Sequence, residues 1–336
     1  MPNVSNGLVF WLSHLILMSG GVAEGRELPR GIDAMRDPPP VLSVDCLETG
    51  HWKNPWVCWS QGGLICNAQG KILATGGTEK GIGFWDVPKG KRLCCWEAAH
   101  GYYSWQIKLS ADGRVLAAAG GKDQRVILVS DVQNGKIRRT WTAPEYLLAL
   151  DVSADGKLVA SISNRGTIHV WDTADGKERA TFQGWAAVFG KDGTTLVIGS
   201  HKKVGVWDLA TGKELRVLEG TATSLTLSAD GKVLAGAGEK GIHVWDLTTG
   251  RLTRTIAANM GGFHMSSVRI SANGRTVALT NDEMIAAWDA ATGKIRFQMP
   301  GNWWYMPSAL SDDGGTFVFS NGSEVECRNL AKPSRP

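Results

Sequence analysis

The sequence has no segment rich in lysine and arginine. Its 336 residues carry 36 basic and 32 acidic side chains, which gives a formal net charge of only +4. Proteins that follow a nucleic-acid backbone need a concentrated basic surface to neutralise the phosphates. We therefore do not expect nucleic acid as a partner.

Metal-binding patterns of cysteine are also missing. The six cysteines are irregularly spaced, and Cys94 and Cys95 are adjacent, which fits no zinc signature. An even number of cysteines is compatible with an oxidising compartment, and buried free thiols are the alternative. The sequence therefore predicts no bound metal and no cofactor.

The first 23 residues lack charged side chains, and their apolar run is short. The twelve residues Gly7–Met18 are interrupted only by Ser13 and His14, and a bilayer span needs about 20. Small residues lead up to Ala23, as in a cleavage site. We interpret residues 1–23 as a signal peptide, although no basic residue marks its start. An uncleaved membrane tether or a misplaced start codon is the alternative.

A signal peptide predicts an exported protein, in the periplasm, outside the cell or associated with the envelope. Without one the protein would be cytoplasmic, and contact with a membrane is expected only through an uncleaved N-terminal segment. Residues 24–40 end in three prolines and read as an extended linker, because proline runs neither join a sheet nor continue a helix.

What the chain has in abundance is internal repetition. A short turn motif occurs seven times at intervals of 37 to 43 residues, and its glycines are Gly70, Gly113, Gly156, Gly193, Gly231, Gly274 and Gly314. A second motif follows at residues 83–91, 128–136, 169–177, 205–213, 243–251 and 286–294, with a degenerate copy at 325–333. A fixed period near this length is typical of repeat architectures. The sequence therefore predicts seven structural units.

Each unit predicts four short strands. Asp-Gly or Asn-Gly supplies the positive φ angles of a tight hairpin turn, and runs of Val, Ile, Leu and Ala lie on either side. Strands that are apolar on both faces are expected where each small sheet is covered on two sides. Beyond the N-terminal segment, no stretch has the 3.6-residue period of an amphipathic helix. We expect an all-β fold.

The order of these motifs resembles the WD-repeat (WD40) family, in which a third strand ends in Trp-Asp and a Thr-Gly-Lys-like turn follows. The resemblance covers residues 41–332 and leaves 333–336 as a short tail. It implies a seven-bladed β-propeller of four-stranded antiparallel blades around a central channel. The Trp-Asp pairs, which we expect to be structural, are Trp85 and Asp86, Trp171 and Asp172, Trp207 and Asp208, Trp245 and Asp246, and Trp288 and Asp289.

One family feature is incomplete. Blades of this family often contain a hydrogen-bonded set of Asp, His, Ser or Thr, and Trp. Here only His100 stands at the expected distance from its turn glycine, and its own blade has Ser130 in place of the Trp. Most blades are therefore expected to depend on apolar stacking.

The last unit stops after its third strand. We expect Val41–Leu47, an extended apolar segment, to supply the missing outer strand and close the ring, because a bare strand edge invites aggregation. Cys46 would then run beside Cys327, and a disulfide between them would hold the ring shut. Two unrelated thiols placed on adjacent strands by chance are the alternative.

Aromatic side chains gather in the segments that lead into the innermost strand of each unit. All four tyrosines lie there, although small polar residues would suffice for a turn. Trp and Tyr give a large contact area with a polar edge, and they dominate binding hot spots. A binding face is therefore predicted, with a plug of the channel as the alternative. The candidate partner-binding residues are Trp56, Trp59, Tyr102, Tyr103, Trp105, Tyr146, Trp185, Phe263, Trp303, Trp304 and Tyr305.

Catalysis finds little support in the sequence. Two residues before each turn motif, the inner strands carry Ile65, Lys108, Asp151, Val188, Thr226, Arg269 and Ala309. One Asp with two cations does not make a metal-binding ring, so paired or solvated charges are expected in the channel. None of the loop histidines has a nearby Ser or Cys in a nucleophile setting.

The sequence thus predicts a non-catalytic scaffold that binds a protein or peptide through the aromatic loops at the channel mouth. A carbohydrate- or small-ligand-binding propeller is the alternative, since the same aromatics can stack on sugar rings. A propeller enzyme is the weaker alternative, because the fold hosts many functions.

Overall fold

The regular structure in the described part of the chain is β-strand. The computed structural model describes residues 51–52, 64–66, 72–78, 81–86, 91–96, 106–121, 123–132, 136–260, 267–301, 308–320 and 325–330. For those between 51 and 96, and for 320 and 325–327, only the backbone is described. All of them belong to the unit Val41–Pro336. Within these residues the predicted all-β fold is confirmed.

The strands form seven four-stranded antiparallel sheets, here called blades one to seven. Blade one contains β2 (Leu64–Cys66), β3 (Ile72–Thr78), β4 (Gly81–Asp86) and β5 (Lys91–Trp96), and blade two contains β6 (Gln106–Leu109), β7 (Val115–Gly120), β8 (Val126–Asp131) and β9 (Ile137–Thr142). Blade three contains β10 (Leu147–Val152), β11 (Leu158–Ser163), β12 (Thr167–Asp172) and β13 (Glu178–Gln183), and blade four contains β14 (Ala186–Phe189), β15 (Thr195–Gly199), β16 (Val204–Asp208) and β17 (Glu214–Leu218). Blade five contains β18 (Ser224–Leu227), β19 (Val233–Gly238), β20 (Gly241–Asp246) and β21 (Arg251–Ile256), and blade six contains β22 (Ser267–Ile270), β23 (Thr276–Thr280), β24 (Met284–Asp289) and β25 (Ile295–Pro300). Blade seven contains β26 (Ser308–Leu310), β27 (Thr316–Ser320), β28 (Val325–Asn329) and β1 (His51–Trp52).

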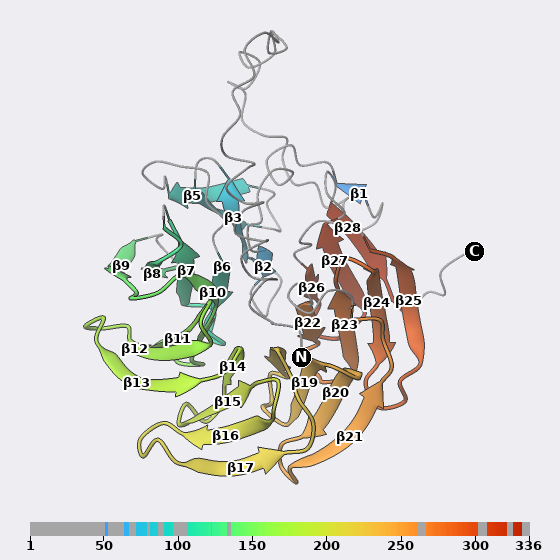
Figure 1. Ribbon diagram of the computed structural model, residues 1–336. Helices are drawn as coiled ribbons and strands as arrows, with labels where there is room; N and C mark the ends of the chain where they lie inside the picture. The colour runs from blue at the N-terminus through green and yellow to red at the C-terminus, as the bar shows by residue number, and fades with distance from the viewer. Residues whose placement is uncertain are drawn as a thin grey trace, which may run out of the picture. The chain divides into compact units, whose positions relative to one another are not determined.

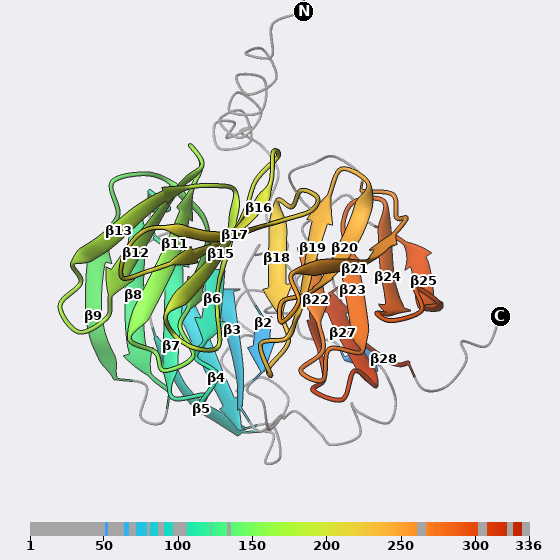
Figure 2. The same ribbon diagram turned by 90° about the horizontal axis from the view of Figure 1, so that it is seen from below.

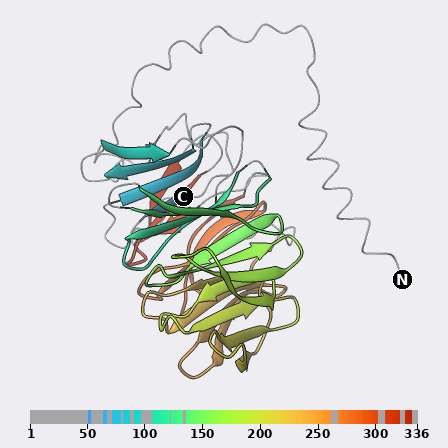
Figure 3. The same ribbon diagram turned by 90° about the vertical axis from the view of Figure 1, so that its left-hand side faces the viewer.

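The blades follow one another in a ring around a common centre (Figure 1). The first strand of each blade is its innermost, and each of these inner strands contacts the inner strand of the next blade, with β26 returning to β2. In the view at right angles to the first, β18 and β22 of neighbouring blades lie near the centre (Figure 2). From the side, the sheets of blades three and four are stacked in sequence (Figure 3). The chain therefore folds as a closed β-propeller.

Blade seven is completed by a strand from the other end of the fold. Strand β1 pairs antiparallel with β28, with His51 opposite Glu326 and Trp52 opposite Val325. An N-terminal closing strand was predicted, but the segment is His51–Trp52 rather than Val41–Leu47, which lies outside the described residues.

Cys327 lies in β28 opposite Val318 of β27. It follows Glu326, the partner of His51, whereas Cys46 precedes His51 by five positions. Cys46 lies outside the described residues, so the disulfide with Cys327 stays a prediction.

Apolar side chains fill the space between neighbouring blades. Ile168 and Phe182 of blade three pack in one cluster with Phe189, Leu196 and Ile198 of blade four. Two middle strands, β7 and β23, are buried along their whole length. Strands covered on both faces need apolar residues at every position, which is why the sequence shows continuous apolar runs rather than alternation.

The repeated Ser-Ala-Asp-Gly motif makes the turn between the first and second strands. In blade three the Ser153 hydroxyl donates to Asp155 Oδ1 (2.8 Å) and accepts from the Leu158 amide (2.9 Å), while the Lys157 amide donates to Asp155 Oδ1 (3.1 Å). Gly156 adopts φ +70°, a conformation that costs other residues energy. The predicted tight turn is therefore held by side-chain acceptors as well as by glycine.

The tryptophans of the Trp-Asp pairs differ in their burial. Trp171, Trp245 and Trp288 are buried, whereas Trp207 is only half-buried. One face of the Trp207 ring lies under Lys203 Nζ, 5.7 Å from the ring centroid, and Phe182 packs edge-on against it. A charged side chain thus takes the place of apolar cover in blade four. For Trp85 and Asp86 only the backbone is described.

The aspartates of these pairs organise the turn that follows the third strand. Each of the four whose side chains are described accepts a hydrogen bond from a backbone amide two or three residues later, at 2.7 to 2.9 Å. The pairs are Asp172 with Ala174, Asp208 with Thr211, Asp246 with Thr248, and Asp289 with Thr292. The carboxylate satisfies a donor that the turn would otherwise leave unpaired.

The predicted signal peptide, linker and C-terminal tail lie outside the described residues. In the part of the chain that is described, no helix has the length and hydropathy that a membrane span requires.

Candidate functional site

One side of the propeller carries two sets of connections, which we call the loop face. They are the loops that lead into the inner strands (143–146, 184–185, 219–223, 257–260 and 301) and the turns between second and third strands (164–166, 200–203, 239–240 and 281–283). Backbone hydrogen bonds join the two sets: Asn164 N donates to Tyr146 O, Ala222 N to Ser200 O, and Gly301 N to Glu283 O. The loop face is therefore a connected surface held by the blades.

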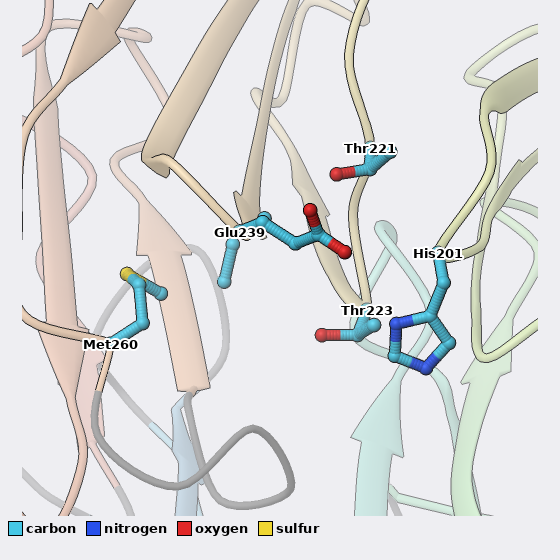
Figure 4. Close-up of a pocket in the computed structure, with 7 residues that line it drawn as sticks. His201, Thr221, Thr223, Glu239 and Met260 are labelled. Carbon is cyan, nitrogen blue, oxygen red and sulfur yellow. The ribbon is translucent and has the colours of Figure 1, made fainter. Parts of the chain in front are cut away.

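A pocket opens on the loop face where blades four and five meet (Figure 4). His201 reaches it from the turn between β15 and β16, Thr221 and Thr223 from the loop into β18, and Glu239 from the turn between β19 and β20. Met260, in the loop after β21, lies on its far side. The hollow is shallow, because the space inside it for a water-sized molecule is only about 10 Å³.

The backbone under this pocket is fixed by buried groups. Thr221 O lies 3.1 Å from Nδ1 of His243, and Glu219 O accepts a 2.7 Å hydrogen bond from the Trp245 indole. His243 and Trp245 belong to β20 of blade five, and both are buried. The short loop into β18 is thus held from below by two side chains of its own blade.

Trp185 extends the site toward blade four. Its ring lies edge-on to the His201 imidazole, with centroids 5.9 Å apart. The Trp185 amide donates to Gly199 O at 2.8 Å, which fixes the residue at the start of β14. The pocket and its rim therefore combine an aromatic face with hydroxyl, imidazole and carboxylate groups, which suit a polar ligand or a peptide backbone.

Tyr146 lies on the same face at the start of blade three. Its side chain is 39% exposed, and partial burial raises the pKa of its hydroxyl, which keeps it protonated as a donor. Hydrogen bonds on both sides hold the backbone, because Tyr146 O accepts from Asn164 and the next amide, Leu147 N, donates to Gln124 O. An exposed aromatic residue is thus presented from a fixed position.

The sequence identified Tyr146 and Trp185 but missed the pocket beside them. His201, Thr221, Thr223 and Glu239 come from short segments with no aromatic residue, so a search for aromatic loops passes over them. Met260 lies in the same loop as the candidate Phe263 but is not itself aromatic. The signal that could have found them is that the loops into the inner strands and the turns between second and third strands lie on the same side of the fold. The other nine candidates lie outside the described residues: Trp56, Trp59, Tyr102, Tyr103, Trp105, Phe263, Trp303, Trp304 and Tyr305.

The channel carries three charged side chains on inner strands, as the sequence predicted. Lys108 Nζ lies 3.9 Å from Asp151 Oδ1, so these two charges are paired. Burial lowers the pKa of Lys108, with the Arg269 charge acting in the same direction and Asp151 opposing it. Burial raises the pKa of Asp151, against the effect of Lys108. The Lys108 side chain still has 37% of its surface open to solvent, so protein surrounds it without sealing it.

The described residues contain no cluster of side chains that could bind a metal ion. Within those ranges no three His, Cys, Asp or Glu side chains are placed to hold one ion together.

Comparisons with known proteins agree with this architecture. Residues 135–172 and 212–246 match the family described as "WD domain, G-beta repeat". Among solved structures, the fold is similar to a chain in "Crystal Structure of Mitotic Checkpoint Complex", with a TM-score of 0.66 and 19% sequence identity. That match covers 92% of this chain and 97% of the other, and at this identity it concerns the fold alone. No curated protein matches the sequence.

Proposed function

We propose that this chain, a WD-repeat β-propeller, is a non-catalytic scaffold that binds a protein or peptide partner on its loop face. Propellers of this family are typically protein-interaction scaffolds. Seven blades that contact one another hold the loops in place, so little conformational entropy is lost when a partner binds.

The observation that carries the proposal is the presentation of Tyr146. A large aromatic side chain is 39% exposed on a loop whose backbone is hydrogen-bonded on both sides. Tyrosine held in this way offers a wide contact area and a hydroxyl donor, the combination that is enriched in binding hot spots. Nothing in the turn itself requires an aromatic residue there.

The test compares variants of the full chain by affinity capture from extracts of its native cells. Tyr146→Ala should weaken retention of a specific partner by about tenfold or more, the effect of losing one hot-spot residue. Leu215→Ala is the matched control, because Leu215 is 59% exposed but lies on the outer strand β17, away from the loop face. Equal retention by both variants and the parent would overturn the proposal.

A carbohydrate is the second candidate, favoured by the groups around the pocket. The Trp185 ring stands beside His201, and the hydroxyls of Thr221 and Thr223 and the carboxylate of Glu239 line the same space. Aromatic faces with nearby polar groups suit sugar rings. Binding of soluble oligosaccharides that is lost in Trp185→Ala and kept in Tyr146→Ala would favour this candidate.

Export and the disulfide between Cys46 and Cys327 are further proposals, supported by the uncharged apolar N-terminus and the even number of cysteines. Sequencing the N-terminus of protein isolated from its native cells, and mapping its disulfides by mass spectrometry, would test both. A chain that begins at residue 1 with two free thiols would overturn them.

A further inference from the structure

Arginine side chains on the outer strands reach across to the next blade. Opposite the third-strand residue that precedes the tryptophan position, blades two, four and five carry Arg139, Arg216 and Arg254. Arg216 Nη1 donates to Leu247 O at 3.2 Å, and Arg254 Nε donates to Ala291 O at 2.6 Å. Both oxygens belong to the turn after the third strand of the following blade. Blades four and five are thus each tied to the next blade by a guanidinium.

The glycine of that turn shows where these arginines lie. A Cβ added to this glycine in blades three, five and six would lie 2.5 to 3.3 Å from an arginine of the preceding blade, and the pairs are Gly176 with Arg139, Gly250 with Arg216, and Gly293 with Arg254. Gly212 is the equivalent glycine of blade four, and no other part of the chain lies within 4 Å of a Cβ built there. Among these four turns, the one in blade four therefore lacks an arginine beside it.

The missing arginine leaves a hollow between blades three and four. Ala180 stands at the position of the arginine, opposite Val170 in the strand register, and its methyl group is too short to reach blade four. The space for water-sized molecules there is about 280 Å³, with one side open to solvent, against about 10 Å³ in the pocket of the loop face. Leu158, Val170 and Leu209 line the hollow as part of the apolar packing between the two blades. The hollow is therefore roomy and has apolar walls.

The carbonyl groups that an arginine would reach are present in blade four. Leu209 and Ala210 line the hollow, and they are the equivalents of Leu247 and Ala291 in the next two blades. The three turns have the same backbone conformation, because the turn glycine has φ between +65° and +74° and its amide donates to the backbone oxygen of the Trp-Asp aspartate at 2.7 to 2.9 Å. Among the described residues, no hydrogen bond reaches the backbone oxygen of Leu209 or Ala210. The hollow therefore combines apolar walls with two available acceptors.

The charges at the rim of the hollow favour a cation. Arg179 lies at this rim, and its Nη2 donates to Asp172 Oδ2 and to Asp175 Oδ2, both at 2.9 Å. Two carboxylates with one guanidinium leave this group with one excess negative charge. Arg179 does not replace the missing arginine, because these bonds tie it to the turn of its own blade, as Arg296 is tied to Asp289 in blade six.

We propose that the hollow between blades three and four binds an arginine side chain of a partner protein or peptide. The apolar stem of the arginine packs against Leu158 and Ala180, and the guanidinium donates to the backbone oxygens of the blade-four turn, as the protein's own arginines do in the following blades. The hollow lies at the turns that join first to second and third to fourth strands. It is therefore on the side opposite the loop face and does not depend on the partner surface proposed there.

Solution NMR of the full chain tests the site with acetyl-Gly-Arg-Gly-amide and with its lysine and leucine counterparts. The arginine peptide should shift the Gly212 amide resonance saturably and bind about tenfold or more tightly than the leucine peptide, which has no charged donor. The lysine peptide should also bind more weakly than the arginine peptide, since an ammonium lacks the planar fork that meets two oxygens. No saturable shift with the arginine peptide would overturn the proposal. Equal binding by the leucine peptide would overturn it in favour of an apolar occupant, and equal binding by the lysine peptide in favour of charge alone.

A substitution that fills the hollow locates the site. Ala180→Arg gives blade three the side chain that blades two, four and five already carry, so this variant should bind the arginine peptide about tenfold or more weakly and melt at a higher temperature. Thr181→Arg is the matched control, because Thr181 is exposed on the same strand, faces the other side of the sheet and gains the same charge. Equal affinity of Ala180→Arg, Thr181→Arg and the parent would contradict the assignment.

The reverse substitution is a second test, which does not depend on the folding of Ala180→Arg. Arg254→Ala removes the donor to Ala291 O between blades five and six and should create a second site of the same kind. The arginine peptide should then shift the Gly293 amide as well as the Gly212 amide, whereas Arg251→Ala, which removes an exposed arginine of the same strand, should create no new site. Thermal melting checks that each variant is folded. A folded Arg254→Ala variant that binds the peptide at Gly212 alone would refute the equivalence of the two positions, and with it the proposal.

Discussion

The indole Nε1 of Trp171 donates a 2.8 Å hydrogen bond to the hydroxyl of Ser161 on the neighbouring strand. Both residues are buried inside blade three. In blade five the residue that occupies the place of Ser161 in the strand register is Gly236, and Trp245 donates instead to the backbone oxygen of Glu219. The tryptophan of the repeat therefore finds a different acceptor in each of these blades.

Replacing Ser161 with alanine should lower the free energy of unfolding by about 1–3 kcal/mol, because the buried indole N–H loses its acceptor. Urea denaturation measures the change. In a Trp171→Phe background the same substitution should cost much less, since no N–H remains to satisfy. An equal loss in both backgrounds would show that packing of the serine, and not the hydrogen bond, sets its effect.

The hydrogen bond from the Phe189 amide of blade four to Asp151 of blade three gives a second prediction. Asp151→Ala removes the acceptor of the Phe189 amide and the partner of Lys108, and should lower the unfolding free energy by about 1–3 kcal/mol. Asp151→Asn removes the same charge but keeps an oxygen for the amide, so its loss should be smaller. Equilibrium unfolding of both variants decides, and an alanine variant as stable as the asparagine variant would contradict this role.

Two glycines with positive φ should respond differently to alanine. Gly212 has φ +65° and open space around it, so Gly212→Ala should cost about 1–2 kcal/mol, the strain of the left-handed conformation. Gly241 has φ +115°, and an added Cβ would lie 2.2 Å from the backbone oxygen of Ile256. Gly241→Ala should therefore cost more than about 3 kcal/mol, because the backbone of β21 must move. Melting temperatures of the two variants that fall by the same amount would be inconsistent with this.

Asp289 should stabilise the fold in a pH-dependent way. Burial opposes its ionisation, but hydrogen bonds from the Thr292 amide and the Arg296 guanidinium outweigh burial and lower its pKa to about 2. Because the pKa is lower in the folded state than the ordinary value of 3.8, the ionised carboxylate contributes stability above that value. The contribution is lost as the pH falls through about 2.

Asp289→Asn should therefore lower the unfolding free energy by roughly 1–2 kcal/mol at pH 7, allowing for solvent screening, and the difference from the parent should disappear near the folded-state pKa. Asp312→Asn is the control, because burial and the neighbouring Asp313 raise the pKa of Asp312, so its loss should not destabilise the protein at pH 7. A difference for Asp289→Asn that stays constant down to low pH would rule out the electrostatic explanation.

The blades could be predicted because their signals are local. Ser153, Asp155 and Gly156 make one turn among themselves, and Asp172 caps the turn that follows its own strand. Each signal lies within a few residues and repeats along the chain, so periodicity alone indicates the strands. The half-burial of Trp207 was not visible in this way, since it depends on the position of Lys203 against the ring.

The closing strand and the pocket depend on relationships between distant segments. Val41–Leu47 has the composition of a strand, but β28 pairs with His51 and Trp52 instead, and composition alone does not indicate which of the two segments forms that pairing. His201 and Glu239 are unremarkable turn residues that become neighbours only when blades four and five pack together. The charged positions in the channel, by contrast, followed from counting back from each turn.

The pairing of β1 with β28 has a consequence for the order in which the molecule is made. His51 and Trp52 leave the ribosome before any blade exists, whereas their partners Glu326 and Val325 emerge after nearly all of the fold has been synthesised. During translation, the first inner strand β2 lacks its contact with β26, because β26 is synthesised near the end of the chain. A contact between such distant segments forms slowly. The nascent propeller is thus most exposed to chaperones and to mispairing just before release, and ring closure marks the end of that interval.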